Sequence, residues 1–358
     1  MCPLTLYEPP DLPLAQPVET VPVLKKAITA TKALAILNGV ITQLPNPVCL
    51  MQSLLLQESK DSASIENIIT THDALYQATL GLPKVSPETQ SVYQYSLALQ
   101  AGMRLMQKDG LILMRHTVAI QGMLVGNTAG IRAQAGTVLK HQQTGETIYT
   151  PPQSVDDIRR LLATLERYIN TPDNTNPIVK MAIIHHQFES IHPFYDGNGR
   201  TGRILNSLYL MYAGELVLPV LYLSRYIEHH KTLYYKRLQS VRTTGKWEPW
   251  IMYMLNAVEK TAQQETTVIL EMIALMETTT QQLKTAYPKL YSTDLVVALF
   301  SSPYTKIDTL AHTLGITRQT ASTYLKKLVS IGIMAEKKVH SRKVYINSAL
   351  FRLLTQQF

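Results

Sequence analysis

Cysteine is scarce in this sequence, because only Cys2 and Cys49 occur among its 358 residues. Two thiols cannot form a disulfide framework, and no Cys/His cluster has the spacing of a zinc site. These absences exclude a small secreted protein stabilised by disulfides. They fit a reducing compartment, and we expect a cytoplasmic protein.

We also expect neither a targeting segment nor an apolar run long enough to cross a membrane. The N-terminus has no basic region followed by a continuous apolar stretch, so we expect no secretory signal peptide. The most apolar stretch, from Leu208 to Leu223, is interrupted by Glu215 and Pro219. A transmembrane helix needs roughly 20 predominantly apolar residues in a row. We therefore expect no membrane partner.

The charge is unevenly distributed along the chain. The length predicts two or three domains, and the 46% hydrophobic content allows a substantial core. Residues 289–358 contain ten Lys or Arg and three Asp or Glu, so they carry +7 of the net charge of +8. A basic C-terminal region on a nearly neutral body suggests a nucleic-acid partner.

The most informative segment is His192–Arg203, which reads His-Pro-Phe-Tyr-Asp-Gly-Asn-Gly-Arg-Thr-Gly-Arg. Before it, Asn176 and Pro177 are typical of a helix start, and the apolar spacing predicts a helix to about Ile191. After it, the apolar spacing predicts a second helix that begins near Gly199. The segment therefore forms a loop at the N-terminus of a helix.

The residues of this loop suit the chemistry of phosphate groups. Unpaired amides at a helix N-terminus attract anions, and Gly197 and Gly199 let the backbone approach a phosphate closely. Arg200 and Arg203 lie on one helix face, and each can bind phosphate oxygens through two N–H groups. Asp196 offers an oxygen ligand of the kind that Mg²⁺ takes alongside substrate phosphates.

His192 adds a candidate base to the same loop, since an imidazole titrates near neutral pH and can accept a proton from an attacking hydroxyl. The simpler alternative is a glycine-rich capping turn with solvated arginines and a histidine at a helix end. A base, a carboxylate, Asn198 and two arginines converge on one turn, and this convergence favours a nucleotide site.

The segment resembles the signature of the Fic family, H-x-F-x-(D/E)-G-N-G-R-x-x-R, at every fixed position. The resemblance implies an α-helical fold and transfer of AMP from ATP to a hydroxyl of a target protein. It makes His192 the general base and Asp196 the Mg²⁺ ligand, with Phe194 anchoring the loop in the core. Arg200 would support the phosphate loop, and Arg203 would hold the γ-phosphate. The ATP-binding residues that it implies are Gly197, Asn198, Gly199, Arg200, Thr201, Gly202, Arg203 and Tyr235. Tyr235 belongs to a tyrosine pair at helical positions, and such a pair is more often core packing.

A second motif lies upstream, where Ser62-Ala63-Ser64-Ile65-Glu66-Asn67 resembles the inhibitory motif of the family, (S/T)-x-x-x-E-(G/N). The resemblance implies that Glu66 pairs with Arg203 and so prevents it from binding the γ-phosphate. The alternative is an N-cap serine, Ser62, with a glutamate in the first turn of a helix. We also expect a hairpin, with strands at residues 137–139 and 146–149. By resemblance it is the flap that holds the target by strand addition; the alternative is a surface hairpin without a partner.

The last seventy residues have the spacing of a helix-turn-helix. A short helix ends at Gly315, and Thr317 caps a second helix with Ala321, Leu325 and Leu328 on its apolar face. The pattern resembles winged-helix domains, with strands at 333–336 and 343–346 and a wing tip at His340-Ser341-Arg342. The charge favours DNA binding, and protein contact or dimerisation is the alternative. The exposed face of the second helix would present Arg318, Gln319, Thr320, Ser322, Thr323 and Lys326.

The sequence thus predicts a mainly α protein with an extended arm (1–21), an N-terminal helical region with the inhibitory helix (22–100), a Fic catalytic domain and following helices (101–288), and a winged helix (289–358). We expect a cytoplasmic protein adenylyltransferase that uses ATP and Mg²⁺ on a Tyr, Thr or Ser hydroxyl of a target protein. One alternative is another nucleotide or phosphate transfer, or AMP removal, at the same site. Another is a DNA-binding regulator that senses nucleotide. The oligomeric state stays open, with a homodimer as one option.

Overall fold

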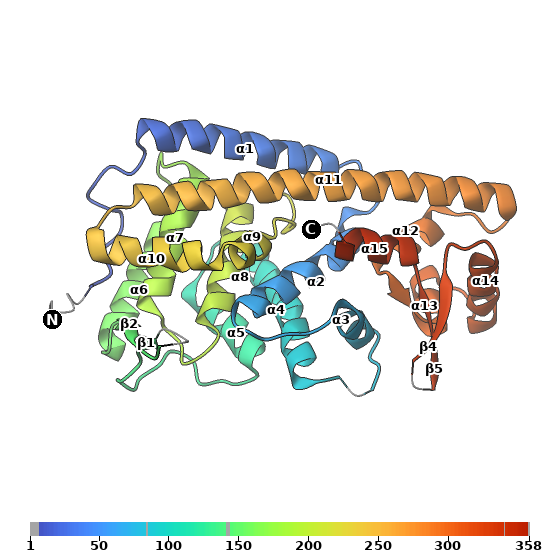
Figure 1. The fold of residues 1–358 in the computed structure, drawn as a ribbon, viewed down its shortest axis with the longest axis horizontal. Helices are drawn as coiled ribbons and strands as arrows, with labels where there is room; N and C mark the ends of the chain where they lie inside the picture. Colours follow the sequence, from blue (N-terminus) through green and yellow to red (C-terminus); the bar gives the residue numbers. More distant parts are fainter. Residues whose placement is uncertain (1–6, 84, 141–143, 340, 357–358) are drawn as a thin grey trace.

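The computed structural model describes residues 7–83, 85–140, 144–339 and 341–356, so Cys2 and His340 lie outside the described residues. The described residues form a mainly helical protein with two small sheets (Figure 1). The first part of the chain contains α1 (Val21–Ile41), α2 (Pro47–Ile65), α3 (His72–Thr79), α4 (Pro87–Asp109), α5 (Met114–Val125), β1 (Leu139–Lys140) and β2 (Thr147–Tyr149).

The middle of the chain is helical throughout its regular elements. It contains α6 (Val155–Asn170), α7 (Pro177–Ile191), α8 (Asn198–Tyr212), α9 (Leu223–His229), α10 (Lys231–Thr244) and α11 (Glu248–Ala286). The C-terminal part contains α12 (Thr293–Ser301), β3 (Tyr304–Thr305), α13 (Ile307–Leu314), α14 (Arg318–Ser330), β4 (Ala335–Val339), β5 (Arg342–Ile346) and α15 (Ser348–Gln356). None of the helices in the described ranges has both the length and the apolar character needed to cross a membrane.

The long helix α11 packs against α1, α7, α9, α10, α12 and α15. It extends for 39 residues along the longest axis, and α1 packs beside its N-terminal half (Figure 1). Thr20 caps α1, and its hydroxyl also donates to Glu248 at the start of α11 over 2.7 Å. Lys26 of α1 forms an ion pair with Glu259 of α11, which fixes the register of the two helices.

Helix α7 lies at the centre of the fold. Asn176 caps it, Pro177 occupies its first turn, and every residue from Ile178 to Ile191 is buried. A helix that is buried on all sides is expected at the core of a large domain rather than at its surface. The start and the end of α7 are those that the sequence predicted. Both ends of α7 are therefore held inside the protein, which gives the loop that follows a fixed position.

Trp250 on α11 connects this helix to α7 in the core. It is fully buried, its Nε1 donates to the carbonyl oxygen of Ala182 on α7 over 2.8 Å, and its ring stacks on His185. We expect Trp250→Ala to lower the free energy of unfolding by about 3–5 kcal/mol. Chemical denaturation measures this change. Leu270→Ala on the exposed side of the same helix is the control, with an expected change within about 0.5 kcal/mol.

The C-terminal part contains the two consecutive helices that the sequence predicted. Gly315 ends α13 with a φ of +63°, and the hydroxyl of Thr317 caps α14. The predicted apolar face of α14 is fully buried. The hairpin differs in detail, because β4 begins two residues later and a short strand, β3, joins the sheet in the order β3-β5-β4. A two-residue strand has no periodicity from which it could be predicted.

This C-terminal part packs against α2 and α3. The hydroxyl of Ser53 on α2 donates to the carbonyl oxygen of Ser301 at the end of α12 over 2.7 Å. On α3, the ring of Tyr76 stacks on Tyr304 of β3 with a centroid distance of 5.6 Å. Asp73 of the same helix accepts a hydrogen bond from the Tyr304 hydroxyl and lies 3.5 Å from Nζ of Lys337. The basic C-terminal part is thus in direct contact with α2, whose last turn carries Ser62.

Candidate active site

The loop between α7 and α8 is closed by its own side chains. His192 ends α7 in the left-handed region, with φ +49° and ψ +59°, and its N–H donates to the carbonyl oxygen of Phe188 over 3.0 Å. Phe194 is fully buried and packs on Phe188. The side chain of Asn198 both donates to and accepts from the backbone of Phe194 at 2.9 Å. Because the side chain of Asn198 is hydrogen-bonded within the loop, its backbone amide is the group that can bind an anion.

The first turn of α8 presents the backbone amides that an anion requires. Gly197 precedes this turn with a φ of +78°, which is a conformation that glycine adopts without strain. The first amides of a helix have no intrahelical acceptor, so those that follow Gly197 are available to a ligand. A Cβ on Gly199 would lie 2.8 Å from Oε1 of Glu66 and 2.9 Å from Nη1 of Arg203. Glycine is needed at that position because a carboxylate and a guanidinium both approach it.

Two further residues of the predicted ATP site face the protein interior. A Cβ on Gly202 would lie 2.7 Å from Oε1 of Glu189 on α7 and 3.2 Å from the ring of Phe188. Gly202 thus allows α7 and α8 to approach each other closely. Thr201 is fully buried, and its hydroxyl has no hydrogen-bond partner among the described residues.

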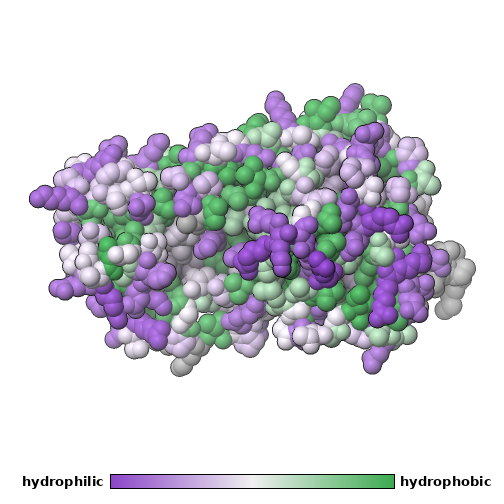
Figure 2. All heavy atoms as spheres, turned by 180° about the vertical axis from the view of Figure 1, so that it is seen from behind, coloured by the Kyte–Doolittle hydropathy of each residue, from purple (hydrophilic) through white to green (hydrophobic). Residues whose placement is uncertain are grey.

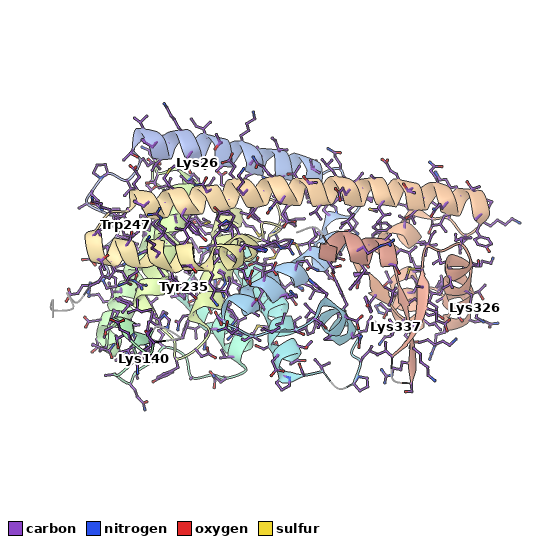
Figure 3. The ribbon with its side chains drawn as sticks, in the orientation of Figure 1. Lys26, Lys140, Tyr235, Trp247, Lys326 and Lys337 are labelled. Atoms are coloured by element: carbon purple, nitrogen blue, oxygen red, sulfur yellow. The ribbon has the colours of Figure 1, made fainter. Side chains whose placement is uncertain are left out.

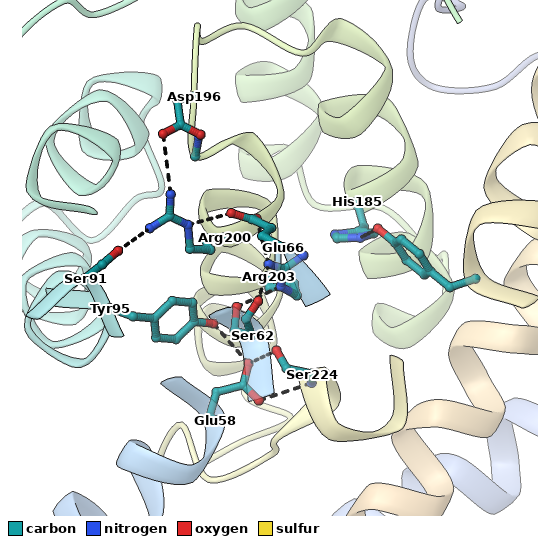
Figure 4. A network of polar contacts seen from close by, with 12 residues as sticks. Glu58, Ser62, Glu66, Ser91, Tyr95, His185, Asp196, Arg200, Arg203 and Ser224 are labelled. Atoms are coloured by element: carbon teal, nitrogen blue, oxygen red, sulfur yellow. Dashed lines mark hydrogen bonds and ion pairs between the residues drawn. The ribbon is translucent and has the colours of Figure 1, made fainter. Parts of the chain in front are cut away.

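Glu66 pairs with both arginines of the loop (Figure 4). Its Oε1 is 2.9 Å from Nη2 of Arg203, as the sequence predicted, and its Oε2 is 2.7 Å from Nε of Arg200. Ser62 completes the binding of Arg203, because its hydroxyl and its carbonyl oxygen accept from Nε and Nη2 over 2.8 and 2.9 Å. The contact with Arg200 was not predicted, although the two arginines share one helix face. One carboxylate therefore occupies the donors of two guanidinium groups.

The interpretation of Ser62 as a helix N-cap is wrong, because the segment ends a helix. α2 ends at Ile65, and Asn67 is left-handed with a φ of +62°. The N–H of Ile68 donates to the carbonyl oxygen of Ala63 over 3.0 Å, which is the bond of a Schellman motif. Glycine and asparagine are the residues that accept the left-handed position of this motif. The left-handed conformation at the end of α2 thus explains why the last position of the inhibitory motif, Asn67 here, is Gly or Asn.

Polar contacts hold α2 in place beside α9. Glu58 is buried and accepts hydrogen bonds from the Tyr95 hydroxyl at 3.0 Å and from the backbone N–H and the hydroxyl of Ser224 (Figure 4). Burial raises the pKa of the Glu58 carboxyl to about 7. One turn later, Asp61 is 2.9 Å from Nε of Arg225. The sequence analysis missed Glu58, whose partners are 37 and 166 residues away along the chain.

His192 and Asp196 differ in their electrostatic surroundings. Burial, followed by the charges of Arg242 and Arg132, lowers the pKa of the His192 imidazole to about 3. The expectation that His192 titrates near neutral pH is therefore wrong for the protein without a nucleotide. The carboxylate of Asp196 is 72% exposed, accepts from the backbone N–H of Gly197 over 2.7 Å, and lies 3.7 Å from Nη2 of Arg200.

The donor set fits Mg²⁺ in one way only. Within the described residues, no group of three or more His, Cys, Asp or Glu side chains could hold a metal ion. Mg²⁺ is usually bound through one or two carboxylates together with substrate phosphates and water. Asp196 supplies one exposed carboxylate beside the first turn of α8. Its place therefore fits an ion that arrives with a nucleotide, and not an ion held by protein ligands alone.

The predicted tyrosine pair on α10 is divided between the core and the surface. Tyr234 is buried, and its hydroxyl lies 2.8 Å from Nε2 of His185. Tyr235 is 45% exposed and packs edge-on against Tyr234 (Figure 3). Core packing thus explains Tyr234, whereas Tyr235 is accessible to a ligand.

The predicted hairpin is present and is tied to the loop, but its first strand is Leu139–Lys140 instead of 137–139 and its second begins at Thr147 instead of 146. β1 and β2 pair antiparallel, with residues 141–143 outside the described part, and Lys140 lies at its outer end (Figure 3). The hydroxyl of Tyr149 on β2 donates to the carbonyl oxygen of Ser190 on α7 over 2.7 Å. On the other side, the hydroxyl of Tyr195 accepts from the backbone N–H groups of Ala133 and Gln134 at 3.0 and 3.2 Å. Hydrogen bonds therefore join the hairpin to the end of α7, and the segment before the hairpin to the loop that follows α7.

Three family models match consecutive parts of the chain. One described as Fic/DOC family N-terminal matches residues 24–104, and one described as Fic/DOC family matches residues 111–210. Together they span about half of the sequence. A third, described as the C-terminal domain of SoFic-like protein adenylyltransferase, matches residues 275–350.

Curated relatives match about half of the chain. Proteins named protein adenylyltransferase Fic from Culex quinquefasciatus and Aedes aegypti are 26% and 28% identical to the chain over 187 and 172 residues. The alignments cover 50% and 46% of the chain, and 35% and 32% of the two relatives. The chain thus spans about a third of the length of these relatives.

Solved structures share the fold. A Fic family protein from Desulfovibrio desulfuricans G20 superposes with a TM-score of 0.60 at 20% identity, over 93% of this chain and 98% of that one. Fic-1 from C. elegans superposes with a TM-score of 0.51 at 18% identity, over 72% and 74%. At these identities the likeness concerns the fold, which for the first of them extends over nearly the whole chain.

Proposed function

Because the chain belongs to the Fic/DOC family, we propose that it is a protein adenylyltransferase, which transfers AMP from ATP to a hydroxyl of a target protein. The observation that carries this proposal is the convergence of His192, Arg203 and the first turn of α8 in one loop. The proposed step forms a bond between the target oxygen and the α-phosphorus. It breaks the bond from that phosphorus to the bridging oxygen, so that pyrophosphate leaves. The hydroxyl proton passes to the imidazole of His192.

The other residues of the loop divide the work of holding the nucleotide. The amides of the first turn of α8 would bind phosphate oxygens, and Arg203 would bind the γ-phosphate. Asp196 would hold Mg²⁺, which when bound neutralises charge on the phosphates. Tyr235, the exposed member of its pair, would contact the nucleotide from α10.

The proposal includes inhibition within the chain. A guanidinium that is already paired with Glu66 cannot bind a γ-phosphate at the same time, so ATP would bind in an unproductive position. The support is the double contact of Glu66 with Arg200 and Arg203, together with the hydrogen bonds from Arg203 to Ser62. Activity would then require that the end of α2 move or that the carboxylate of Glu66 be removed.

Mass spectrometry of the protein after incubation with ATP and Mg²⁺ tests this function. An added AMP on the chain or on a target would support it, and an added phosphate would indicate a kinase-like transfer instead. Loss of AMP from a previously modified protein would indicate the removal reaction. ATP labelled at the α-phosphorus, run beside ATP labelled at the γ-phosphorus, separates the first two outcomes without a known target.

A second function is favoured by the C-terminal part, residues 289–358, which we propose to be a winged-helix domain that binds DNA in the cytoplasm. Its charge and the exposure of Arg318, Gln319 and Lys326 on α14 support this. Lys326 and Lys337 lie at the far end of the molecule from the hairpin (Figure 3). Figure 2 shows this end from behind, at the left of the view, with hydrophilic side chains over most of its outline.

Lys326→Ala is expected to weaken binding to a DNA duplex. Each phosphate contact that is lost should reduce the slope of log affinity against log salt concentration by about 0.9, because fewer counterions are released. Fluorescence anisotropy over a salt series measures both quantities. Lys25→Ala, which removes an exposed charge from α1, is the matched control. If both variants bind DNA as the unmodified chain does, α14 is not the DNA-binding helix.

A further inference from the structure

The C-terminal end of α7 is bound by charged donors, although it is deep in the protein. The last four carbonyl groups of a helix have no intrahelical partner, and they are usually satisfied by water, glycine motifs or neighbouring side chains. Here the groups concerned belong to Glu189, Ser190, Ile191 and His192. Their partners are two arginines and a tyrosine from three other elements of the chain.

Arg132 comes from the segment between α5 and β1 and is fully buried. Its Nε donates to the carbonyl oxygen of His192 over 2.8 Å, and Nη2 donates to that of Ile191 over 3.4 Å. Nη2 also donates to the carbonyl oxygen of Pro152, just after the hairpin. The backbone N–H of Arg132 donates to the carbonyl oxygen of Pro193 over 2.9 Å. One residue thus joins the end of α7, the loop and the base of the hairpin.

Arg242 approaches the same helix end from α10. Its Nη2 donates to the carbonyl oxygen of Glu189 over 3.3 Å, and its Nε donates to the hydroxyl of Ser190 over 3.1 Å. Its guanidinium lies over the ring of Tyr149 at 3.9 Å from the centroid. Tyr149 in turn donates to the carbonyl oxygen of Ser190. The second arginine therefore binds the helix end together with the hairpin strand β2.

Neither guanidinium forms an ion pair with a carboxylate in the part of the chain that the structure describes. A buried charge without a counter-ion is costly, so helix carbonyls and the negative end of the helix dipole must compensate it. Neutral donors could cap α7 without this cost. Two cations at one helix end, directly before the proposed base, therefore call for a reason beyond capping.

We propose that Arg132 and Arg242 are positioning residues for the transfer reaction, which hold the backbone of His192 in its left-handed conformation and place near its imidazole two positive charges that an anionic nucleotide would offset. The inference rests on the proposed function for its purpose, but its physical content concerns His192 alone. The triphosphate would offset the two positive charges at the moment when a base is needed. The same contacts would set the hairpin against the loop.

The charges around His192 agree with this assignment. Burial is the largest cause of the lowered pKa of His192, the charges of Arg242 and Arg132 lower it further, and the backbone of Glu189 acts in the opposite direction. The carboxyl of Glu189 on α7, whose pKa burial raises to about 7, also lies at this helix end, as does the phenol of Tyr149 on β2. Further titratable groups interact with one of the two arginines: His186, Tyr7, Tyr195 and Tyr234. The arginines are therefore the cationic groups that disfavour a protonated imidazole.

The test is an NMR titration of the His192 ring, assigned by comparison with His192→Gln. Removing one like charge near a titrating group typically shifts the pKa by about 1–3 units. We expect Arg242→Gln and Arg132→Gln to raise the pKa of His192 by that amount. Lys236→Gln, which removes an exposed charge from α10, should leave it unchanged. An unchanged pKa in both arginine variants would overturn the proposal.

Two further variants keep the test decisive. If a glutamine variant does not fold, Arg242→Lys and Arg132→Lys keep the charge and lose the paired hydrogen bonds. We expect the low pKa to persist and the transfer rate in a Glu66→Gly background to fall. A rate equal to that of the Glu66→Gly parent in both lysine variants would contradict the positioning role. The titration needs no activity, so a shifted pKa without any AMP transfer would reject the proposed function and leave the role of the arginines standing.

Discussion

Glu66→Gly is expected to raise the rate of AMP transfer, although it removes a buried contact. The carboxylate of Glu66 occupies Nε of Arg200 and Nη2 of Arg203, so its removal frees both guanidinium groups for phosphate oxygens. A coupling free energy of about 1–3 kcal/mol between such competing states corresponds to a change of roughly 5–150-fold. Auto-modification with ATP labelled at the α-phosphorus measures the effect, with Glu8→Gly in the N-terminal arm as a control.

The same substitution should lower stability. Removing one partner of a buried charge pair typically costs about 3–5 kcal/mol, because the remaining charges lose their counter-ion. Activity and stability are thus expected to change in opposite directions. A structural role for Glu66 predicts loss of both, so equal or lower labelling in a folded Glu66→Gly variant would reject the inhibitory interpretation. Adding Arg203→Ala to Glu66→Gly should return labelling to a low level.

His192→Ala is expected to reduce transfer by about 10²–10⁴-fold and to leave nucleotide affinity nearly unchanged. The imidazole lies at the end of α7 and is proposed to take a proton, whereas the phosphate donors lie on α8. Calorimetry with ATP and the labelling assay measure the two quantities separately, both in the Glu66→Gly background. His312→Ala, on the exposed side of α13, is the control. Turnover equal to that of the Glu66→Gly parent in the Glu66→Gly/His192→Ala variant would rule out the base assignment.

The parts of the site that the sequence predicted are those built from local spacing. Both ends of α7, the start of α8, the cap at Asn176 and the glycine turns follow from residues within one or two turns of each other. The pairing of Glu66 with Arg203 joins residues 137 positions apart, and only the resemblance to a family predicted it. Physical pattern alone interpreted Ser62 as the start of a helix, because a serine before an acidic residue occurs at both ends of helices.

What the sequence did not predict depends on burial and on distant partners. Nothing near Glu58 in the sequence indicates that Tyr95 and Ser224 surround it, and its pKa follows from that environment. Likewise, the reference pKa of histidine describes an exposed ring, whereas His192 has two arginines from other elements near it. Arg132 and Arg242 have no motif around them that distinguishes them from surface arginines.

Helix α2 contacts two distant parts of the molecule at once. Its first half packs on α12 and α15, and its last turn leads to Glu66 at the arginines. A ligand of the C-terminal part that prefers one placement of α2 would therefore alter the affinity of the site for a nucleotide. Thermodynamic linkage makes this effect mutual, since the nucleotide would change the affinity for that ligand by the same factor. If DNA is such a ligand, its dissociation constant is defined only together with the ATP concentration at which it is measured.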